Sequence, residues 1–357
     1  MKKKQIIFTG GGTAGHVMVN IALIPEFLKD GWRVDYIGSV NGIEKELITS
    51  IEGVTYHPIS TGKLRRYFSK ENFKDPFKVM KGTLQAYRII GSKRPSVIFS
   101  KGGFVSVPVL IAAKLRKVPA VIHESDYTPG LANKIAIPFS KKVLTTFPET
   151  VNYLPKEKAE AIGAVVRDEL FTGSREQGYQ LTGLKADKNI LLVMGGSAGS
   201  QKINEAVRNG LDTLLHSFHI IHICGKNNYA KEYERQGYVQ YEYVSEELKD
   251  LLAITDLVCS RAGSNSIFEF LALHKPMLLI PLSLQASRGD QIVNAKSFSK
   301  QGYANVLEEE NLTTETLKQA LLQLKEDKFT IKDTMSTYHS KEAKQKVIDI
   351  IYAASEQ

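Results

Sequence analysis

The chain has 357 residues, 43% hydrophobic and 24% charged, so it is long enough to form two soluble domains with buried cores. Its 47 Lys and Arg outnumber 38 Asp and Glu, and the net charge of +9 fits either a solvated basic surface or a partner rich in phosphate. No apolar run approaches a membrane span or a signal-peptide core, which predicts a soluble cytoplasmic protein whose membrane contact is peripheral.

Short apolar runs alternate with longer helical patterns along the chain. The first series of predicted strands comprises Gln5–Thr9, Arg33–Gly38, Val54–Pro58, Ser96–Ser100, Ala120–His123 and Lys142–Thr145. The second series comprises Asn189–Met194, His219–Cys224, Val239–Tyr243, Leu257–Cys259 and Met277–Ile280. Strands rich in Val and Ile that alternate with helices predict an α/β protein, with parallel sheets covered by helices on both faces.

The two series predict two domains of similar construction. Each series opens with a strand that runs into glycines, "FTGGGTAGH" in the first and "VMGGSAGS" in the second. We place the link near Gly163–Arg167, so that residues 1–163 form the N-terminal domain and residues 164–339 the C-terminal domain. The last segment is predicted to be a helix, and residues 340–357 are expected to pack back on the N-terminal domain.

The first glycine turn follows a predicted strand and opens a predicted helix. Such a turn presents backbone N–H groups at the positive end of a helix dipole, where phosphate or diphosphate binds. Gly10, Gly12 and Gly15 also satisfy the G-x-G-x-x-G pattern of dehydrogenases, but that site needs an acidic residue at the end of the second strand. Here Asp35 lies inside that strand, and no glycine turn has the Walker A pattern, so a dehydrogenase and a P-loop kinase are both disfavoured. The alternative is a tight strand–helix connection without a ligand.

A third glycine turn lies in "SRAGSNSIFEF", where Gly263 and Ser264 precede a helix that carries Glu269. A diphosphate at the start of this helix would place the attached ribose hydroxyls near the carboxylate of Glu269. This arrangement predicts recognition of a nucleoside diphosphate. The alternative for Glu269 is a solvated helix residue.

Two further groups are candidates for proton transfer. His16 lies at the start of the first helix, where the helix dipole favours the neutral imidazole that can accept a proton. His123 and Glu124 follow a strand, at the sheet edge where ligands bind in open α/β folds. His16 and Glu124 could therefore face one cleft between the domains, although a histidine at a helix start can also be purely structural.

The sequence resembles the MurG family of peptidoglycan N-acetylglucosaminyltransferases over nearly its whole length. The motifs that carry the resemblance are "GGGTAGH", "SKGGFVSVP", "HESDYTPGLANK", "GGSAGS", "SRAGSNSIFE" and "DQIVNA". The resemblance implies the GT-B fold, two Rossmann-like doubly wound parallel-sheet domains with an interdomain cleft. It also implies inverting transfer of N-acetylglucosamine from UDP-N-acetylglucosamine to the C4 hydroxyl of the muramoyl sugar of lipid I, which forms lipid II.

The resemblance also implies roles for individual residues. His16 matches the candidate base, with Glu124 as the alternative. The residues that match substrate contacts are Gly11, Gly12 and Thr13 in the first loop, Asp126 near the sugar, Arg167 and Ser197 at the diphosphate, Val244 at the uracil edge, Ser264 and Asn265 in the phosphate cradle, Glu269 at the ribose and Gln291 at the sugar hydroxyls.

Three positions depart from the family pattern. Ala14 stands where the family commonly has a glycine, and alanine is tolerated there only if the backbone φ of this residue is negative. Asp126 stands where an asparagine often contacts the sugar, and Asp290 where a glutamine is common, and an ionised carboxylate can accept but not donate.

No cofactor or metal is expected. The chain has no Asp-x-Asp pair, and its two cysteines, Cys224 and Cys259, fit no metal spacing and are predicted to be core residues. The resemblance implies that helix dipoles and side chains stabilise the departing diphosphate. UDP-N-acetylglucosamine is then the donor substrate, lipid I the acceptor, and nucleic acid is not a partner.

A membrane contact is predicted between residues 62 and 88, since a lipid acceptor has to be reached at the cytoplasmic face of the membrane. The helical spacing of apolar residues, with lysines between them, is typical of a helix on an anionic lipid surface. The apolar residues are Phe73, Phe77, Met80 and Leu84, and the lysines are Lys74, Lys78 and Lys81. The alternative is a helix that turns its apolar face to the core.

Two other functions stay open from the sequence. One is another enzyme of the same architecture, such as a UDP-sugar epimerase or a transferase with a soluble acceptor. The other is a non-catalytic sensor of a nucleotide sugar.

Overall fold

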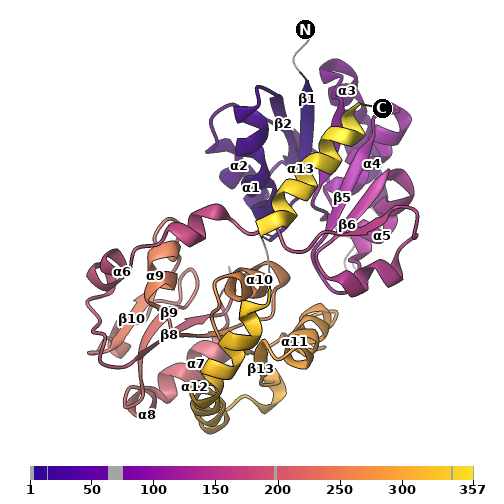
Figure 1. Ribbon diagram of the computed structural model, residues 1–357. Coiled ribbons are helices and arrows are strands. Elements are labelled where there is room, and N and C mark those ends of the chain that lie inside the picture. Colours follow the sequence, from indigo (N-terminus) through magenta and orange to yellow (C-terminus); the bar gives the residue numbers. More distant parts are fainter. Residues whose placement is uncertain (1–3, 14, 63–74, 197–198, 339–340, 357) are drawn as a thin grey trace. The chain divides into compact units, whose positions relative to one another are not determined.

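The computed structural model describes residues 4–13, 15–62, 75–196, 199–338 and 341–356. The chain divides into two compact units (Figure 1). The N-terminal unit comprises Met1–Val166 and Ser340–Gln357, and the C-terminal unit comprises Arg167–His339.

The N-terminal unit is built on a parallel sheet of seven strands in the order β3-β2-β1-β4-β5-β6-β7. Its strands are β1 (Gln5–Thr9), β2 (Arg33–Ser39), β3 (Val54–Ile59), β4 (Val97–Ser100), β5 (Ala120–Glu124), β6 (Lys142–Thr145) and β7 (Ala159–Ala161). Its α-helices are α1 (Gly15–Lys29), α2 (Ile43–Thr49), α3 (Asp75–Lys93), α4 (Ser106–Leu115), α5 (Leu131–Ala136) and α13 (Lys341–Ser355).

Helices cover both faces of this sheet, because successive residues of a strand point to opposite faces. In β1, Ile6 and Phe8 join a core cluster with α1 and α13, while Ile7 joins a second cluster with α3 and α4. The C-terminal helix α13, yellow in Figure 1, lies along this unit and buries Val347 and Ile351 in the first cluster.

The C-terminal unit has a second parallel sheet, of six strands in the order β10-β9-β8-β11-β12-β13. Its strands are β8 (Asn189–Met194), β9 (Phe218–Ile223), β10 (Tyr238–Tyr241), β11 (Leu257–Ser260), β12 (Met277–Leu279) and β13 (Ala304–Val306). Its α-helices are α6 (Arg175–Thr182), α7 (Gln201–Asn209), α8 (Leu211–Leu214), α9 (Leu248–Ile254), α10 (Ser264–Ala272), α11 (Asp290–Lys300) and α12 (Thr314–Ser336).

The two parallel sheets confirm the predicted α/β fold class. Every predicted strand is present, with ends that differ by at most two residues, but β7 and β13 were not predicted. Each has only three residues, and β7 reads "AEA" with an exposed glutamate, so neither strand has the apolar run that signals a buried strand.

Strand order also locates the edge at which a ligand can bind. The order reverses between β1 and β4 in the N-terminal sheet, and between β8 and β11 in the C-terminal sheet. In open α/β sheets the crevice at such a reversal, at the carboxyl ends of the strands, is the usual ligand site. The three predicted glycine turns follow β1, β8 and β11, so the sequence motifs lie at these reversals.

Candidate functional site

The first glycine turn connects β1 to α1, and two of its N–H groups are already engaged within the N-terminal unit. Gly11 N–H donates to the carbonyl of Gly102 at 3.3 Å, and Gly12 N–H donates to the carboxylate of Glu44 at 3.2 Å. The first contact joins the "GGGTAGH" motif to the "SKGG" motif after β4. Because both amides are occupied, this turn is less open to a phosphate than the sequence predicts, and the substrate contacts of Gly11, Gly12 and the exposed Thr13 stay predictions. Ala14 lies outside the described residues.

Buried side chains hold the start of this turn. The hydroxyl of Tyr36 donates to the carbonyl of Gly10 at 2.7 Å, and the amide of Asn20 donates to the carbonyl of Thr9 at 3.2 Å and to Tyr36 at 3.0 Å. Burial raises the pKa of Tyr36, so its hydroxyl stays protonated and remains a donor. The turn is therefore positioned by a hydrogen-bonded core rather than by solvent-exposed contacts.

His16 is the second residue of α1, and its ring faces back toward the turn. Its Nδ1 lies 3.0 Å from the carbonyl oxygen of Gly11 and 3.1 Å from the hydroxyl of Thr13. A carbonyl oxygen can only accept, so the hydrogen bond to Gly11 assigns the proton to Nδ1. The lone pair then lies on Nε2, which is the form of the ring that a general base requires.

Glu124, the alternative base, ends β5 and ties down the loop that follows. Only 5% of the residue is exposed, and its carboxylate accepts from Asp126 N–H at 3.0 Å, Gly130 N–H at 2.9 Å and the Asn133 amide at 2.8 Å. With both oxygens engaged, this geometry favours a structural role for Glu124 over proton transfer. Its assignment as a base, and the sugar contact of the partly buried Asp126, stay predictions.

A buried lysine that the sequence analysis did not single out lies at the same sheet edge. Lys101 follows β4 and is 2% exposed. Burial lowers its pKa, while the charges of Glu124 and Asp126 oppose that shift. Burial also lowers the pKa of His123 well below its usual value, with a further contribution from Lys101. His123 is therefore a neutral core residue.

Strand β2 does not end in the acidic residue that holds a ribose in dehydrogenases. Asp35 is buried and accepts from Gln5 and His57, each at 2.5 Å, and lies 3.2 Å from the ammonium of Lys93. Burial opposes ionisation of Asp35, but the three partners outweigh it and lower its pKa. This carboxylate is bound within the protein, which agrees with the expectation that a residue inside the strand is wrongly placed to hold a ribose.

In the C-terminal unit, the phosphate cradle predicted at Ser264 and Asn265 lies directly after β11. Ser197 lies outside the described residues. Among the described residues before α7, the hydroxyl of Ser200 accepts from Ile203 N–H and caps that helix. After β11, Ser264 and Asn265 are the first two residues of α10, so they stand at the positive end of its dipole. This is the position that the cradle prediction requires.

Arg167 and Glu269 are brought together although 102 residues separate them. The guanidinium Nε donates to Glu269 Oε1 at 2.8 Å, and a terminal nitrogen donates to Oε2 at 3.2 Å. A second terminal nitrogen donates to Glu169 at 3.2 Å. Arg167, the predicted diphosphate contact, and Glu269, the predicted ribose contact, therefore form one bidentate pair. Two residues that contact neighbouring parts of one nucleotide are expected to lie close together in this way.

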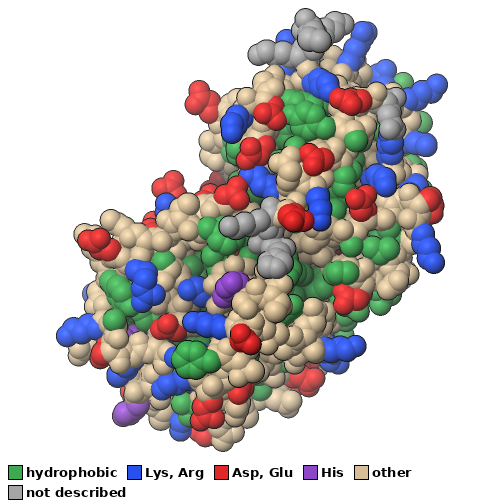
Figure 2. Space-filling view, viewed as in Figure 1, with side chains coloured by type: hydrophobic (Ala, Val, Ile, Leu, Met, Phe, Trp, Pro, Cys, Tyr) green, Lys and Arg blue, Asp and Glu red, His purple; other side chains and the backbone are tan. Residues whose placement is uncertain are grey.

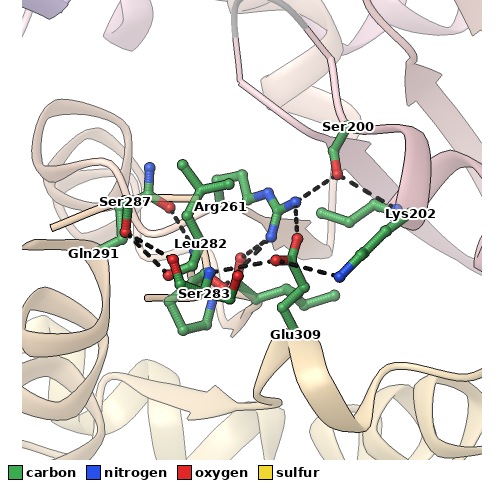
Figure 3. Close-up of polar contacts among 11 residues, drawn as sticks. Ser200, Lys202, Arg261, Leu282, Ser283, Ser287, Gln291 and Glu309 are labelled. Atoms are coloured by element: carbon green, nitrogen blue, oxygen red, sulfur yellow. Dashed lines mark hydrogen bonds and ion pairs between the residues drawn. The ribbon is translucent and has the colours of Figure 1, made fainter. Parts of the chain in front are cut away.

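A buried ion pair joins the glycine turns of the C-terminal unit (Figure 3). Arg261, in the turn after β11, pairs with Glu309 and also donates to the hydroxyl of Ser200 at 2.7 Å and to the carbonyl of Ile280 at 3.1 Å. The second oxygen of Glu309 accepts from Ser283 N–H at 3.3 Å. The turns after β8, β11 and β12 are thus held by one charged network.

Gln291 is the second residue of α11 and is fixed by its amide oxygen. That oxygen accepts from Leu282 N–H at 3.1 Å, as Figure 3 shows, which directs the NH₂ group away from this contact. An NH₂ group held in this way suits donation to a sugar hydroxyl, the role predicted for Gln291. Val244, the predicted uracil contact, lies partly buried in the connection between β10 and α9. Asp290 pairs with Arg288 at 3.1 Å.

The predicted membrane helix is present as α3, and its apolar residues face outward. Phe77 is 72% exposed, Met80 67% and Leu84 51%, while the small residues Gly82 and Ala86 are buried. The alternative of an apolar face turned to the core is therefore wrong for these three positions. Phe73 and Lys74 lie outside the described residues, and Lys81 is exposed.

Charges and possible metal ligands give no further site. On the face drawn in Figure 2, Lys and Arg are interspersed with Asp and Glu over both units. Within the described ranges, no group of three or more His, Cys, Asp or Glu could hold a metal ion, and no helix is long and apolar enough to cross a membrane. Cys224 and Cys259 are buried, as predicted for core residues.

Sequence reasoning missed Glu44, Lys101, Arg261 and Glu309. Lys101 and Arg261 each directly follow a strand within one of the family motifs, so this position indicates that they belong to the ligand-binding edge of the sheet. Glu44 and Glu309 have no such signal. Each lies among other charged residues, and only the fold shows that its side chain is buried.

Comparisons with known proteins identify the family. The family model of the glycosyltransferase family 28 N-terminal domain matches residues 6–145, and that of the glycosyltransferase family 28 C-terminal domain matches residues 190–351. The chain is 64% identical over 348 residues to a protein of Oceanobacillus iheyensis, covering 98% of each chain. It is 55% identical over 346 residues to a protein of Staphylococcus aureus strain MRSA252, covering 97% of each. Both relatives are named UDP-N-acetylglucosamine--N-acetylmuramyl-(pentapeptide) pyrophosphoryl-undecaprenol N-acetylglucosamine transferase.

Solved structures agree on the fold. MurG of Acinetobacter baumannii superposes with a TM-score of 0.76 at 23% identity, covering 98% of this chain and 99% of that one. The glycosyltransferase of kitacinnamycin superposes with a TM-score of 0.77 at 15% identity, covering 99% and 100%. At these identities the likeness shows the fold alone, and it agrees with the predicted GT-B class.

Proposed function

The chain belongs to glycosyltransferase family 28, in the MurG group that its motifs resemble, and we propose that it converts lipid I into lipid II. Lipid I is undecaprenyl-pyrophosphoryl-N-acetylmuramyl-pentapeptide, and the enzyme transfers N-acetylglucosamine to it from UDP-N-acetylglucosamine. The observation that carries this function is the 64% identity over 98% of both chains to a relative named for the same transfer.

The donor is proposed to bind the C-terminal unit. The diphosphate contacts Arg167, Ser197 and the N-terminus of α10 at Ser264 and Asn265, where backbone N–H groups and the helix dipole favour an anion. Glu269 accepts hydrogen bonds from the ribose hydroxyls next to Arg167. The contacts assigned to Val244 and Gln291 complete the set at the uracil edge and the sugar.

The acceptor is proposed to be activated in the N-terminal unit by His16. The C4 hydroxyl of the muramoyl sugar gives its proton to Nε2 while its oxygen bonds to the anomeric carbon of N-acetylglucosamine. The bond from that carbon to the diphosphate oxygen breaks, and UDP leaves with the electron pair. Attack on the face opposite the leaving group inverts the anomeric carbon. Charge on the departing UDP is balanced by Arg167 and helix N-termini, so the proposal includes no cofactor or metal.

The exposed face of α3 is proposed to contact the cytoplasmic membrane. Phe77, Met80 and Leu84 present apolar surface, and Lys78 and Lys81 lie between them in the sequence. Apolar side chains that enter the interface and lysines that pair with anionic headgroups together give peripheral binding. This would bring the enzyme to a lipid-anchored acceptor at the cytoplasmic face.

Release of UDP from UDP-N-acetylglucosamine, measured with and without a lipid I analogue, tests this function. Release that depends on the analogue, with a disaccharide product, is the expected result. Release without any acceptor would instead favour an epimerase or a hydrolytic side reaction, and binding of the donor without turnover would favour a sensor. Either result would contradict the proposed transfer.

A further inference from the structure

Glu44 is a fully buried carboxylate on α2, and it lies against the glycine turn that precedes His16. Its Oε2 accepts from Gly12 N–H at 3.2 Å, and its Oε1 accepts from Ser39 N–H at 2.9 Å and from the Ser39 hydroxyl at 2.5 Å. Among the described residues, none forms an ion pair with it. A buried carboxylate is costly unless its partners compensate it, and the three hydrogen bonds do so here, so a residue of this kind is expected to serve a function.

The turn is shaped to admit this carboxylate. A methyl group built on Gly11 would lie 2.6 and 2.7 Å from the two oxygens of Glu44, so any larger residue would force the carboxylate to move. Glycine at this position therefore lets the backbone approach the carboxylate. The negative charge thus lies against the peptide group that joins Gly11 to Gly12.

This peptide group connects Glu44 to His16. Its N–H, from Gly12, donates to Glu44, and its carbonyl, from Gly11, accepts from Nδ1 of His16 at 3.0 Å. The two ends of a peptide group polarise together, so an anion at the N–H makes the carbonyl a stronger acceptor. The stronger acceptor holds the proton on Nδ1 and favours the positive charge that the ring gains when Nε2 is protonated.

We propose that Glu44 is the positioning residue of His16 and acts on the imidazole through the Gly11–Gly12 peptide. It fills the role of the carboxylate that orients the histidine in a catalytic triad, with one peptide group placed between them. It fixes the tautomer that leaves the lone pair on Nε2, and it stabilises the imidazolium after proton transfer. The proposal rests on the proposed function, because it requires His16 to be the base.

The variant Glu44→Gln tests the proposal, since it keeps the side-chain volume and removes the charge. The expected result is a roughly 10- to 100-fold fall in kcat, the effect of losing a hydrogen bond to a charged group, with an unchanged KM for UDP-N-acetylglucosamine. Nitrogen-15 NMR of the His16 ring should show a mixture of tautomers in the variant and the Nδ1–H form alone in the wild type. Glu46 is an exposed glutamate on the same helix, so Glu46→Gln is the matched control and should change neither kcat nor the tautomer of His16.

A double-mutant cycle separates action through His16 from damage to the turn. In a His16→Ala background, Glu44→Gln should change kcat by less than about twofold, because the group through which it acts is gone. An equal loss in both backgrounds, or wild-type kcat and tautomer in Glu44→Gln, would overturn the proposal. A wild-type kcat in His16→Ala alone would instead refute the base of the proposed function, so the two failures are distinguishable.

A milder variant keeps the test decisive if Glu44→Gln does not fold. Ser39→Ala removes only the hydroxyl that donates to Glu44. It should lower kcat a few-fold and shift the His16 tautomer in the same direction, while thermal unfolding stays close to that of the wild type. A folded Ser39→Ala protein with unchanged kcat and tautomer would count against Glu44 as well.

Discussion

Arg167 and Glu269 form a bidentate ion pair in the C-terminal unit, with two nitrogen–oxygen distances of 2.8 and 3.2 Å. Glu269 lies on α10, the helix whose first turn is the proposed phosphate cradle, and Arg167 precedes the first helical turn of the unit. The pair fixes the carboxylate about one and a half turns from the helix N-terminus. Glu269 is the proposed ribose contact and Arg167 a proposed diphosphate contact, so the pair is central to the proposed donor site.

The variant Glu269→Gln should weaken donor binding. A neutral amide accepts less strongly from the ribose hydroxyls, so the KM for UDP-N-acetylglucosamine should rise by about 10-fold, the cost of losing a charge-assisted hydrogen bond. Initial rates at varied donor concentration measure this change. Glu169→Gln is the control, because Glu169 also pairs with Arg167 but is largely exposed. Equal effects of both changes would place Glu269 outside the nucleotide site.

The variant His16→Ala should lower kcat by about 10²- to 10⁴-fold, the usual contribution of a general base. The KM for UDP-N-acetylglucosamine should change little, because the donor residues lie in the C-terminal unit. Steady-state kinetics with a lipid I analogue give both constants, and His216→Ala, at an exposed histidine, is the control. An unchanged kcat would remove His16 from the proposed role.

The variant Arg261→Met should destabilise the C-terminal unit by about 3–5 kcal/mol, because it leaves the carboxylate of Glu309 buried without its partner. Hydrogen exchange of the β8 and β11 amides measures this loss. Fluorescence of the single tryptophan, Trp32, reports on the N-terminal unit and should not change at low denaturant. Arg235→Met, which breaks an exposed pair with Asp212, should have little effect on either signal.

Glu309 should also make the C-terminal unit sensitive to acid. Burial opposes its ionisation, but the hydrogen bond and charge of Arg261 outweigh burial and lower its pKa. A carboxyl whose pKa is lower in the folded state contributes stability above its ordinary pKa of about 4.5 and loses it as the pH falls through the lowered value.

Unfolding in urea at a series of pH values checks this sign. The wild type should lose stability below about pH 4.5, and the double variant Arg261→Met/Glu309→Leu should lose less over the same range. Parallel pH curves for the two proteins would show that this pair does not contribute to acid sensitivity.

The variant Phe77→Asp should weaken sedimentation with vesicles that contain anionic lipid. An aspartate removes apolar surface from the interface and repels anionic headgroups, and it should not harm folding because Phe77 is 72% exposed. Phe329→Asp is a matched control, since Phe329 is equally exposed but lies on α12 of the other unit. If Phe77→Asp binds vesicles as the wild type does, α3 is not the membrane contact.

Much of the fold follows from contiguous residues. The strand β1 and the glycines after it are adjacent in the chain, so an apolar run that ends in "GGG" predicts a strand, a turn and a helix start without any tertiary information. The same holds for the turns after β8 and β11. Strands β7 and β13 could not be predicted in this way because their sequences, "AEA" and "ANV", contain no apolar run.

Contacts between distant residues were decided only by the fold. Residues 308–310 are three consecutive glutamates, and nothing in their sequence distinguishes Glu309, which is buried against Arg261, from its exposed neighbours. On α3, helical spacing predicted an apolar stripe at Phe77, Met80 and Leu84 but not which side it faces. The fold decided the side, because close packing of α3 admits Gly82 and Ala86 and leaves the larger residues outside.

The sequence by itself determined the strand–turn–helix units, the fold class and the family, because these depend on residues that are neighbours in the chain. The tertiary structure alone decided which charges meet. Glu44 approaches the peptide before Gly12 from 32 positions away, and Glu269 meets Arg167 across 102. Such contacts depend on how the sheet orders its strands, since strand order brings together segments whose separation along the chain carries no pairing signal.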